Sequence, residues 1–533
     1  MNAAVIFAAR RIRLAVGAFS DDPLVLRTAG ALCLVLALTH CARTEAPATS
    51  LPAPAPVART NEAIAADSVE PMPQFDRVLI PPTKLALSLA PTRTSGTAPL
   101  AVMFDATGTT SPQRGLDPYR DIRYRFDFGD APDETWPVTG ASRNAETAGP
   151  IAAHVFERPG TYTVTLTATN SMGTTWVKHA TITVLDPDTV YPGGKTVCVS
   201  LTADYTGCPA GAARRQTMPS KSEWNGKRVL FKRGQDFSSL GRIDIQDGSH
   251  GVIVGAFGAG AAPEMESVGV GDWRPETDDF ASDIVVADLS TRGSMSAGVA
   301  TRVLFLRNTL TSPRDAGSGL YVGDDYFTFD DPDYRIVPTD RFPVASELFF
   351  VENSVSGSTG VTSNGYGHGA RMAWLGNDFG ASMYHNLRIT RGYKFVIAHN
   401  RMRGVSSDGA RHALKFHGGG LTAYNDRAVV AGRTWASRYG IVADNAFGST
   451  AGNNAWTVAI APQNAESAEG IEDVLVIDNR FVRGPNTSVD LILTGRRVTY
   501  RGNALASGEA AAVERNAHGE SLPAEWKGPY YDH

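Results

Sequence analysis

Short apolar runs alternate with turn residues along most of this chain. From about residue 85, hydrophobic side chains recur at every second position, as in Leu85-Leu87-Leu89 and Val164-Leu166. A period of two residues is typical of half-buried β-strands. Short strands of this kind, separated by turns, predict a small β-sandwich.

A second pattern occupies the rest of the chain, where an apolar run ends in Asn and another apolar side chain follows after one intervening residue. The repeated asparagines are Asn308, Asn353, Asn377, Asn400, Asn445, Asn479 and Asn503. Their spacings of 45, 24, 23, 45, 34 and 24 residues are mostly one or two multiples of about 23, and Asn425 is a candidate filler in the second long gap. A repeat of this length predicts a solenoid.

The repeated segments predict strands and not helices. Residues 303–306 and 475–477 are short, bulky or β-branched, and bounded by Gly or Asn. An Asn that recurs at the same corner of stacked coils can form a ladder, in which each amide satisfies a neighbouring amide or a turn backbone group. We therefore interpret these asparagines as structural and not catalytic.

Residues 84–185 resemble a PKD domain. The segments that carry this resemblance are Phe126-Asp127-Phe128-Gly129-Asp130, His154-Val155-Phe156 and Pro159-Gly160-Thr161-Tyr162. The resemblance implies an immunoglobulin-like β-sandwich that acts as a spacer or a weak carbohydrate contact. Phe126 and Ala131 stand where the family usually has Trp and Gly. We expect Asp127 and Asp130 to form turns, and we assign this domain no chemistry.

Residues 190–508 resemble the right-handed parallel β-helix proteins of the pectate-lyase-like superfamily. The resemblance rests on the Asn repeat and on residues 196–200, 228–234 and 251–258, which look like opening coils. It implies an all-β chain, with a sandwich followed by a β-helix. Lyases, hydrolases, epimerases and non-catalytic surface proteins share this scaffold, so the activity must come from a local site.

Composition agrees with a turn-rich chain of several domains. The 533 residues include 53 Gly and 31 Pro, with 42% hydrophobic and 20% charged residues. The net charge of −5 argues against nucleic acid as the main partner, because phosphate binding needs a cationic surface.

The N-terminus predicts export. Four arginines precede the apolar run 29–38, which is too short for a membrane helix and is typical of a secretory signal. The run ends in Leu38-Thr39-His40-Cys41, which resembles a bacterial lipoprotein signal and implies lipidation of Cys41, although His40 departs from the expected small residue. We expect an outer-membrane lipoprotein, a periplasmic protein or a secreted one, with no membrane contact other than this anchor.

An exported protein can form disulfides. If Cys33 leaves with the signal and Cys41 carries lipid or stays free, Cys198 and Cys208 remain as a pair. Two buried thiols are the alternative.

The Pro- and Ala-rich segment 42–83 predicts an extended tether. The predicted divisions are a signal segment at 1–41, this linker, a PKD domain at 84–186, a β-helix at 187–508 and a tail at 509–533.

A basic stretch is the candidate for function. Between His385 and His417 the chain has seven Lys or Arg and four His, against one acid, Asp408. Strand alternation puts Leu414 and Phe416 on one face with His412, and Arg411, Lys415 and His417 on the other, solvent face. With Asn400 and Met402 inward, the residues that point outward are His399, Arg401 and Arg403. Stacked coils could thus build a cationic groove.

Such a groove suits an acidic polysaccharide, whose uronate carboxylates can pair with arginines. Cleavage by β-elimination requires neutralisation of the carboxylate and a base for the adjacent proton. We predict Lys415 or His417 as the base, and Arg411 and Arg401 as the neutralisers. Partial burial and Arg411 would disfavour the charged form of Lys415. The predicted proton donor is His385 or Tyr384, and His399 and Arg403 would bind substrate.

Two other interpretations of the basic stretch stay open. In a glycan-binding or adhesin-like surface protein, the same cations form solvated faces and His412 is a core histidine. The second interpretation is a polygalacturonase-like hydrolase, because Asp324-Asp325 and Gly367-His368-Gly369 resemble elements of that family. Their separation of 43 residues, taken as two coils, argues against it.

An acidic and aromatic insertion occupies the long gap before Asn353. Its carboxylates are Asp324, Asp325, Asp330, Asp331 and Asp333. They could bind calcium, although the sequence does not require a cofactor and a solvated insertion is the alternative. Tyr326 and Tyr334 could stack on sugar rings. We expect a monomer whose partner is an extracellular polysaccharide.

Overall fold

The computed structural model describes residues 84–130, 133–272, 279–311, 319–322, 345–356, 363–404, 411–417, 437–448, 456–460, 471–484, 487, 489–495 and 497–516. Cys41, the predicted linker, the acidic insertion with Tyr326 and Tyr334, Asn425 and the end of the tail lie outside these residues. Among the described residues, no helix is long and apolar enough to cross a membrane.

A β-sandwich forms the first described part of the chain. Its five-stranded sheet consists, in spatial order, of β2 (Ser95–Thr97), β8 (Thr175–Leu185), β7 (Gly160–Thr169), β4 (Arg123–Asp127) and β5 (Ala145–Glu146). The facing sheet consists of β1 (Ala90–Pro91), β3 (Leu100–Asp105) and β6 (Ile151–Phe156). A short helix, α3 (Pro118–Asp121), precedes β4. Phe104, Phe126 and Phe156 lie in the core between the sheets.

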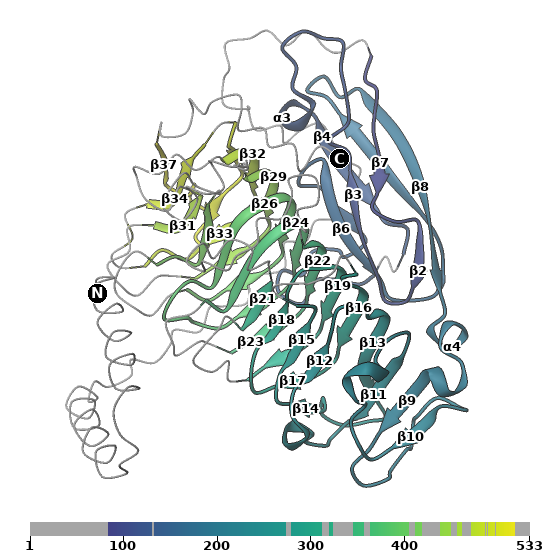
Figure 1. Cartoon of the computed structure of the whole chain (residues 1–533). Coiled ribbons are helices and arrows are strands. Elements are labelled where there is room, and N and C mark those ends of the chain that lie inside the picture. The colour runs from purple at the N-terminus through teal and green to yellow at the C-terminus, as the bar shows by residue number, and fades with distance from the viewer. Residues whose placement is uncertain are drawn as a thin grey trace, which may run out of the picture. The chain divides into compact units, whose positions relative to one another are not determined.

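The rest of the chain is a right-handed parallel β-helix with three faces, in which strands of successive coils pair in parallel (Figure 1). Face A carries the strands that precede the repeated asparagines. These are β9 (Thr196–Val199), β11 (Arg228–Lys232), β13 (His250–Phe257), β16 (Ala281–Ala287), β19 (Ala300–Leu306), β22 (Ser346–Val351), the second halves of β24 (Gly365–Leu375) and β26 (Leu387–Ala398), β29 (Ser437–Ala443), β32 (Ile471–Ile477) and β35 (Thr499–Arg501).

Faces B and C complete each coil. Face B consists of β12 (Ile243–Ile245), β15 (Val268–Val270), β18 (Met295–Ala297), β21 (Leu320–Val322), the first halves of β24 and β26, β28 (Leu414–His417), β31 (Trp456–Ile460), β34 (Val489–Thr494) and β37 (Val513–Asn516). Face C consists of the two-residue strands β14 (Glu264–Met265), β17 (Ser290–Thr291), β20 (Thr309–Leu310), β23 (Ser354–Val355), β25 (Asp378–Phe379), β27 (Arg401–Met402), β30 (Ala446–Phe447), β33 (Arg480–Phe481) and β36 (Ala504–Leu505).

An uninterrupted asparagine ladder joins faces A and C, and this confirms the predicted corner. From Asn308 to Asn479, each side-chain amide nitrogen donates to the amide oxygen of the next rung, at 2.9–3.1 Å, and to a strand carbonyl oxygen. Asn400 bonds directly to Asn445, so Asn425 is not a rung and the prediction of an extra coil there was wrong. The spacings of 45 residues are single coils with insertions, because each insertion lengthens one turn without adding a strand to the stack.

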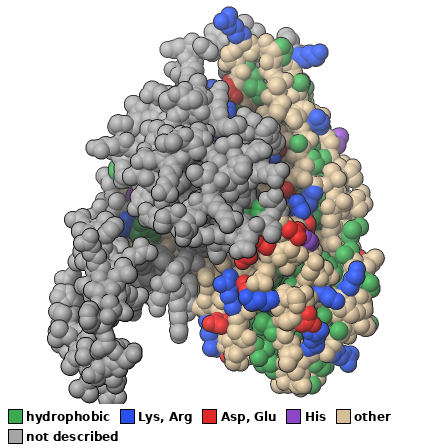
Figure 2. All heavy atoms as spheres, viewed as in Figure 1, with side chains coloured by type: hydrophobic (Ala, Val, Ile, Leu, Met, Phe, Trp, Pro, Cys, Tyr) green, Lys and Arg blue, Asp and Glu red, His purple; other side chains and the backbone are tan. Residues whose placement is uncertain are grey.

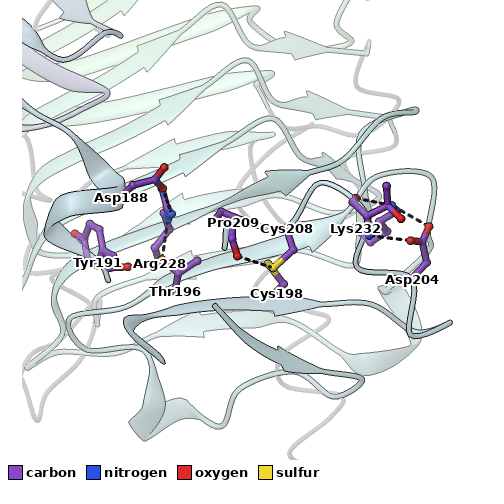
Figure 3. Close-up of a disulfide and its surroundings, with 10 residues drawn as sticks. Asp188, Tyr191, Thr196, Cys198, Asp204, Cys208, Pro209, Arg228 and Lys232 are labelled. Carbon is purple, nitrogen blue, oxygen red and sulfur yellow. Dashed lines mark hydrogen bonds and ion pairs between the residues drawn. A yellow bond between two sulfur atoms is a disulfide. The ribbon is translucent and has the colours of Figure 1, made fainter. Parts of the chain in front are cut away.

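The first coil is closed by a disulfide between Cys198 and Cys208 (Figure 3). Next to this bridge, Lys232 Nζ pairs with Asp204 at 2.9 Å. Arg228, which is buried, donates to Thr196 Oγ1 at 3.0 Å and pairs with Asp188. The short elements around it are α4 (Pro187–Val190), η2 (Gly193–Lys195), β10 (Ala213–Arg215), η3 (Lys221–Glu223) and η4 (Ser238–Leu240).

The sandwich packs on face A and not away from it as a spacer. Strand β3 contacts β22, and β6 contacts β26 and β29. Outward side chains of face A, such as Phe349, Val396 and Ile441, form one buried cluster with Met103 and Ile151 of the sandwich. This apolar contact explains why face A can carry hydrophobic residues on both of its sides.

Ion pairs surround this apolar contact. Four of them join Arg93 to Asp283 at 3.0 Å, Lys394 to Asp105 at 2.7 Å, Arg143 to Glu352 at 3.7 Å and His399 to Glu146 at 3.0 Å. A spacer domain would leave face A open, whereas here the sandwich covers part of it. On the described surface shown in Figure 2, basic and acidic side chains are interspersed.

Candidate functional site

The residues of the basic stretch separate onto three faces of the β-helix. Lys415 lies on β28 of face B, Arg401 and Arg403 lie on or next to β27 of face C, and His399 lies at the end of face A. The single cationic groove predicted from the sequence therefore does not form. Leu414 and Phe416 point inward, as the alternation predicts, but the three sides of a coil direct outward residues in three different directions.

His399 is covered by the sandwich, and only 3% of the residue is exposed. Its ring stacks on Trp136, with 5.2 Å between centroids, and its Nε2 atom lies 3.0 Å from Glu146 Oε2. This burial leaves no room for a substrate at His399. The sequence around His399 does not indicate this burial, because the residues that cover His399 come from another domain.

Arg401 and Arg403 pair with the same carboxylate on face C. Arg403 makes two hydrogen bonds to Asp378, at 3.2 and 2.8 Å, and Arg401 lies 3.5 Å from it. Asp378 belongs to the preceding coil, where β25 pairs with β27. These two arginines already have a structural anion as their partner, and they are separated from Lys415 by a corner of the coil.

On face B, the structure brings three polar outward positions into register. Tyr366 of β24 pairs with Arg388 of β26, which in turn pairs with Lys415 of β28. Neighbouring strands lie about 4.8 Å apart, so the three side chains form a short ladder along the helix axis. The Arg388 guanidinium lies over the Tyr366 ring, 5.5 Å from its centroid. We call this set, together with Tyr384 and Arg411, the face B site.

Arg411 and Tyr384 stand at the corner through which the chain enters face B. The Arg411 guanidinium lies 3.9 Å from the centroid of the Tyr384 ring. Lys415 is only 9% exposed, so it does not lie on the open solvent face that alternation predicts. No Asp or Glu occurs among the described residues 363–369, 380–391, 411–417 and 456–460. The described part of face B thus gathers three basic side chains, Arg388, Arg411 and Lys415.

Two stacked histidines lie beneath the site. His385 and His412 are both buried, and their rings stack 5.5 Å apart. The backbone N–H of His412 donates to Nδ1 of His385 at 3.0 Å, and Nδ1 of His412 donates to the carbonyl oxygen of Trp456 at 3.0 Å. The Nδ1 atom of each histidine therefore forms a hydrogen bond with a backbone group.

Both histidines are held in the neutral form. Burial, followed by the charges of nearby cations, holds the pKa of His385 well below its usual range. Burial also lowers the pKa of His412 to about 4. The cations that contribute to these shifts are Arg388, Arg411 and Lys415. His412 is a core histidine, and His385 is poorly suited to act as a charged acid.

Sequence reasoning did not select Arg388, although it lies inside the basic stretch. Its register with Lys415 could not be read locally, because a face C strand and a face A strand intervene between them. Asn364 and Asn386, which are buried at the entry to face B, were also missed. Both donate to the carbonyl oxygen of Gly380, at 2.6 and 2.7 Å. Their spacing of 22 residues, about one coil, was the signal by which they could have been found.

The side chain of His417, the alternative predicted base, lies outside the described atoms.

The register also corrects one argument against a hydrolase. Val322 of β21 pairs directly with Gly367 of β24, so these two strands belong to adjacent coils of face B. The separation of 43 residues between Asp325 and His368 therefore does not by itself indicate two coils. The side chains of Asp324, Asp325 and His368 lie outside the described residues.

Comparisons with known proteins support the domain prediction. Residues 86–184 match the PKD domain family model. The match covers the described sandwich and confirms the predicted domain type. No curated protein sequence matches the chain.

Several solved β-helix structures are similar at low identity. PfbA, a surface adhesin of Streptococcus pneumoniae, is 10% identical over 54% of this chain and 82% of its own, with a TM-score of 0.31. The tailspike protein gp49 from Pseudomonas phage LKA1 is 11% identical over 82% of this chain and 64% of its own, with a TM-score of 0.23. The family 28 exopolygalacturonase of Yersinia enterocolitica is 10% identical over 82% of this chain and 99% of its own, with a TM-score of 0.28. Likenesses at this level carry no argument about function.

Proposed function

We propose that this protein is an exported enzyme that binds an acidic, uronate-containing polysaccharide along face B and cleaves it by β-elimination. The observation that carries the proposal is the register of Arg388 with Lys415 on adjacent strands, with Arg411 at the neighbouring corner. Three basic side chains close together on one face suit a chain of repeated carboxylates.

In the proposed reaction, Arg388 and Arg411 pair with the substrate carboxylate. This pairing acidifies the proton on the adjacent carbon. Lys415 Nζ removes that proton, the electron pair forms a carbon–carbon double bond, and the bond to the glycosidic oxygen breaks. Lys415 is 9% exposed and lies in register with Arg388, and this position supports it as the base. His417 is the alternative base.

We assign the proton donor to Tyr384 and not to His385. Tyr384 lies under the Arg411 guanidinium at the edge of the site, whereas His385 is buried and neutral. The leaving oxygen would take the phenolic proton. The Tyr384 phenolate would then regain a proton from solvent, and the Lys415 ammonium group would lose its extra proton to solvent. Tyr366 and the Arg388 side chain above it would contact a sugar ring of the bound chain.

The test is incubation of the mature protein with alginate, pectate, glycosaminoglycans and neutral glycans, with and without calcium. The lyase proposal requires an unsaturated product that absorbs in the ultraviolet from an acidic glycan. Lys415→Met and Arg388→Met should each reduce turnover at least about 100-fold. Arg403→Met is the matched control, because its guanidinium pairs with Asp378 on another face.

Two other results would replace this proposal. Saturable, salt-sensitive binding of an acidic glycan without any new chain ends identifies a glycan-binding surface protein. New reducing ends without ultraviolet absorbance identify a hydrolase. A hydrolase is the second candidate, because Asp324-Asp325 and Gly367-His368-Gly369 resemble elements of polygalacturonase-like glycosidases and the strands β21 and β24 pair directly. Asp325→Asn would then abolish turnover and Lys415→Met would not.

A further inference from the structure

A buried group of metal-ligand type lies between the sandwich and the β-helix, away from the face B site. Glu146, His399 and Asp444 each offer one ligand atom, and these atoms lie within 4.8 Å of one another. Glu146 ends strand β5 of the sandwich, whereas His399 and Asp444 follow β26 and β29 of adjacent coils. The three residues therefore belong to two domains.

The β-helix presents its two members by a repeated backbone feature. The residue before each ladder asparagine has a positive φ, which is 60° at His399 and 52° at Asp444. Such a conformation is unfavourable for residues with a side chain. It occurs here because Asn400 and Asn445 must point into the coil, and it brings His399 and Asp444 to the corner on which the sandwich sits. The backbone N–H of His399 donates to Ala443 at 3.2 Å, which fixes their relative position.

The two fully buried ligands are oriented by further hydrogen bonds. Glu146 Oε1 accepts from the backbone N–H groups of Thr147, at 2.8 Å, and Ala148, at 3.2 Å, while Oε2 points to the cluster. His399 Nδ1 lies 3.3 Å from Thr139 Oγ1, which leaves Nε2 toward Glu146. Metal-binding histidines typically have such a hydrogen bond at their second nitrogen.

We infer that Glu146, His399 and Asp444 bind one divalent transition-metal ion, of which Zn²⁺ fits best, and that this ion fastens the sandwich to face A. One imidazole and two carboxylates are ligands that Zn²⁺ accepts at about 2.0–2.2 Å. Such an ion holds its ligand atoms roughly 3.3 Å apart, so the three atoms, which lie within 4.8 Å of one another, would draw closer on binding. The ion also neutralises two carboxylates at a largely buried position.

The experiment is zinc analysis of the full chain after purification and after dialysis against a chelator. We expect one equivalent of zinc, a fall in Tm when it is removed, and recovery of Tm when Zn²⁺ is added back. His399→Gln and Asp444→Asn should each lose the bound equivalent. Thr139→Val, which removes the hydroxyl group next to His399 Nδ1 and a long hydrogen bond from the Ala141 backbone N–H, should weaken zinc binding about 10-fold. Cobalt substitution should produce visible absorption bands that His399→Gln lacks.

Two control variants distinguish loss of the zinc ion from loss of domain docking and from zinc binding at the protein surface. Arg93→Gln removes another interdomain ion pair and should lower Tm without loss of zinc. His250→Gln removes the exposed pair with Asp279 and should leave the stoichiometry at one. Wild-type protein that binds no zinc, or shows no Tm shift on its addition, would overturn the inference and leave a plain ion pair between Glu146 and His399. Retention of zinc by Asp444→Asn and His399→Gln together would also overturn it.

Discussion

The Tyr119 hydroxyl group in the sandwich donates a buried hydrogen bond of 3.0 Å to the carbonyl oxygen of Gly440 in the β-helix. The two residues are 321 positions apart in the sequence. Burial raises the pKa of Tyr119 well above its usual value, so the phenol keeps its proton at any physiological pH. A buried carbonyl oxygen on face A thus accepts a hydrogen bond from the other domain, and we expect the two domains to unfold together.

Tyr119→Phe tests this dependence. We expect the free energy of unfolding to fall by about 1–3 kcal/mol, because the Gly440 carbonyl oxygen loses its partner in a buried place. Urea denaturation followed by fluorescence measures the change. Tyr162→Phe is the control, since its hydroxyl donates to Arg158 at an exposed position within the sandwich, and it should cost less than about 0.5 kcal/mol. Equal effects of the two variants would contradict the interdomain role.

The neutral histidines predict a loss of stability in mild acid. His412 has a pKa of about 4 when folded, against 6.5 for an ordinary histidine. Between these values the unfolded chain binds a proton that the folded chain does not, so stability is complete above pH 6.5 and falls as the pH decreases toward 4. The titration of His412 alone should lower the free energy of unfolding by about 2 kcal/mol between pH 7 and pH 5.

His412→Asn should flatten that pH dependence, because the amide can donate to Trp456 and does not titrate. Unfolding free energies at pH 7 and pH 5 provide the measurement. His179→Asn, at an exposed position of β8, should retain the wild-type slope. A slope that His412→Asn leaves unchanged would assign the acid sensitivity to other groups.

The asparagine ladder should be sensitive at its interior rungs. Asn377 donates to Asn400 and to the Phe350 carbonyl oxygen, and accepts from the backbone and side chain of Asn353. Asn377→Ala leaves several buried groups unsatisfied, so we expect a loss of about 3 kcal/mol or more. Asn225→Ala removes an exposed acceptor and should cost less than about 1 kcal/mol. Thermal denaturation of the two variants gives the comparison, and similar Tm values would show that the ladder contributes little.

The disulfide should stabilise the first coil. It closes a loop with a sequence separation of 10 residues, for which chain entropy predicts about 2–3 kcal/mol. The double variant Cys198→Ser and Cys208→Ser should lower the unfolding free energy by that amount in the absence of reductant. Wild-type protein in strong reductant should show the same loss, and the double variant should then be insensitive to reductant. Sensitivity of the double variant would indicate that another group responds.

The sequence by itself determined the local structure. The alternation of Val164 and Leu166, the PKD segments and the repeated asparagines each depend on contacts between strands with a regular period, so the sandwich, the β-helix and the ladder could be predicted. The inward positions of Leu414 and Phe416 were also predictable, because alternation within one strand needs no knowledge of its neighbours.

The tertiary structure decided which outward residues meet. Arg401 and Lys415 are 14 positions apart, yet they lie on different faces, while Arg388 and Lys415 are 27 positions apart and lie side by side. The lengths of the insertions do not reveal the register, because an insertion can lengthen one coil or add another. The sandwich then removed face A, with His399, from solvent. Packing between domains depends on complementary surfaces formed by distant segments, and no pattern local to either segment encodes it.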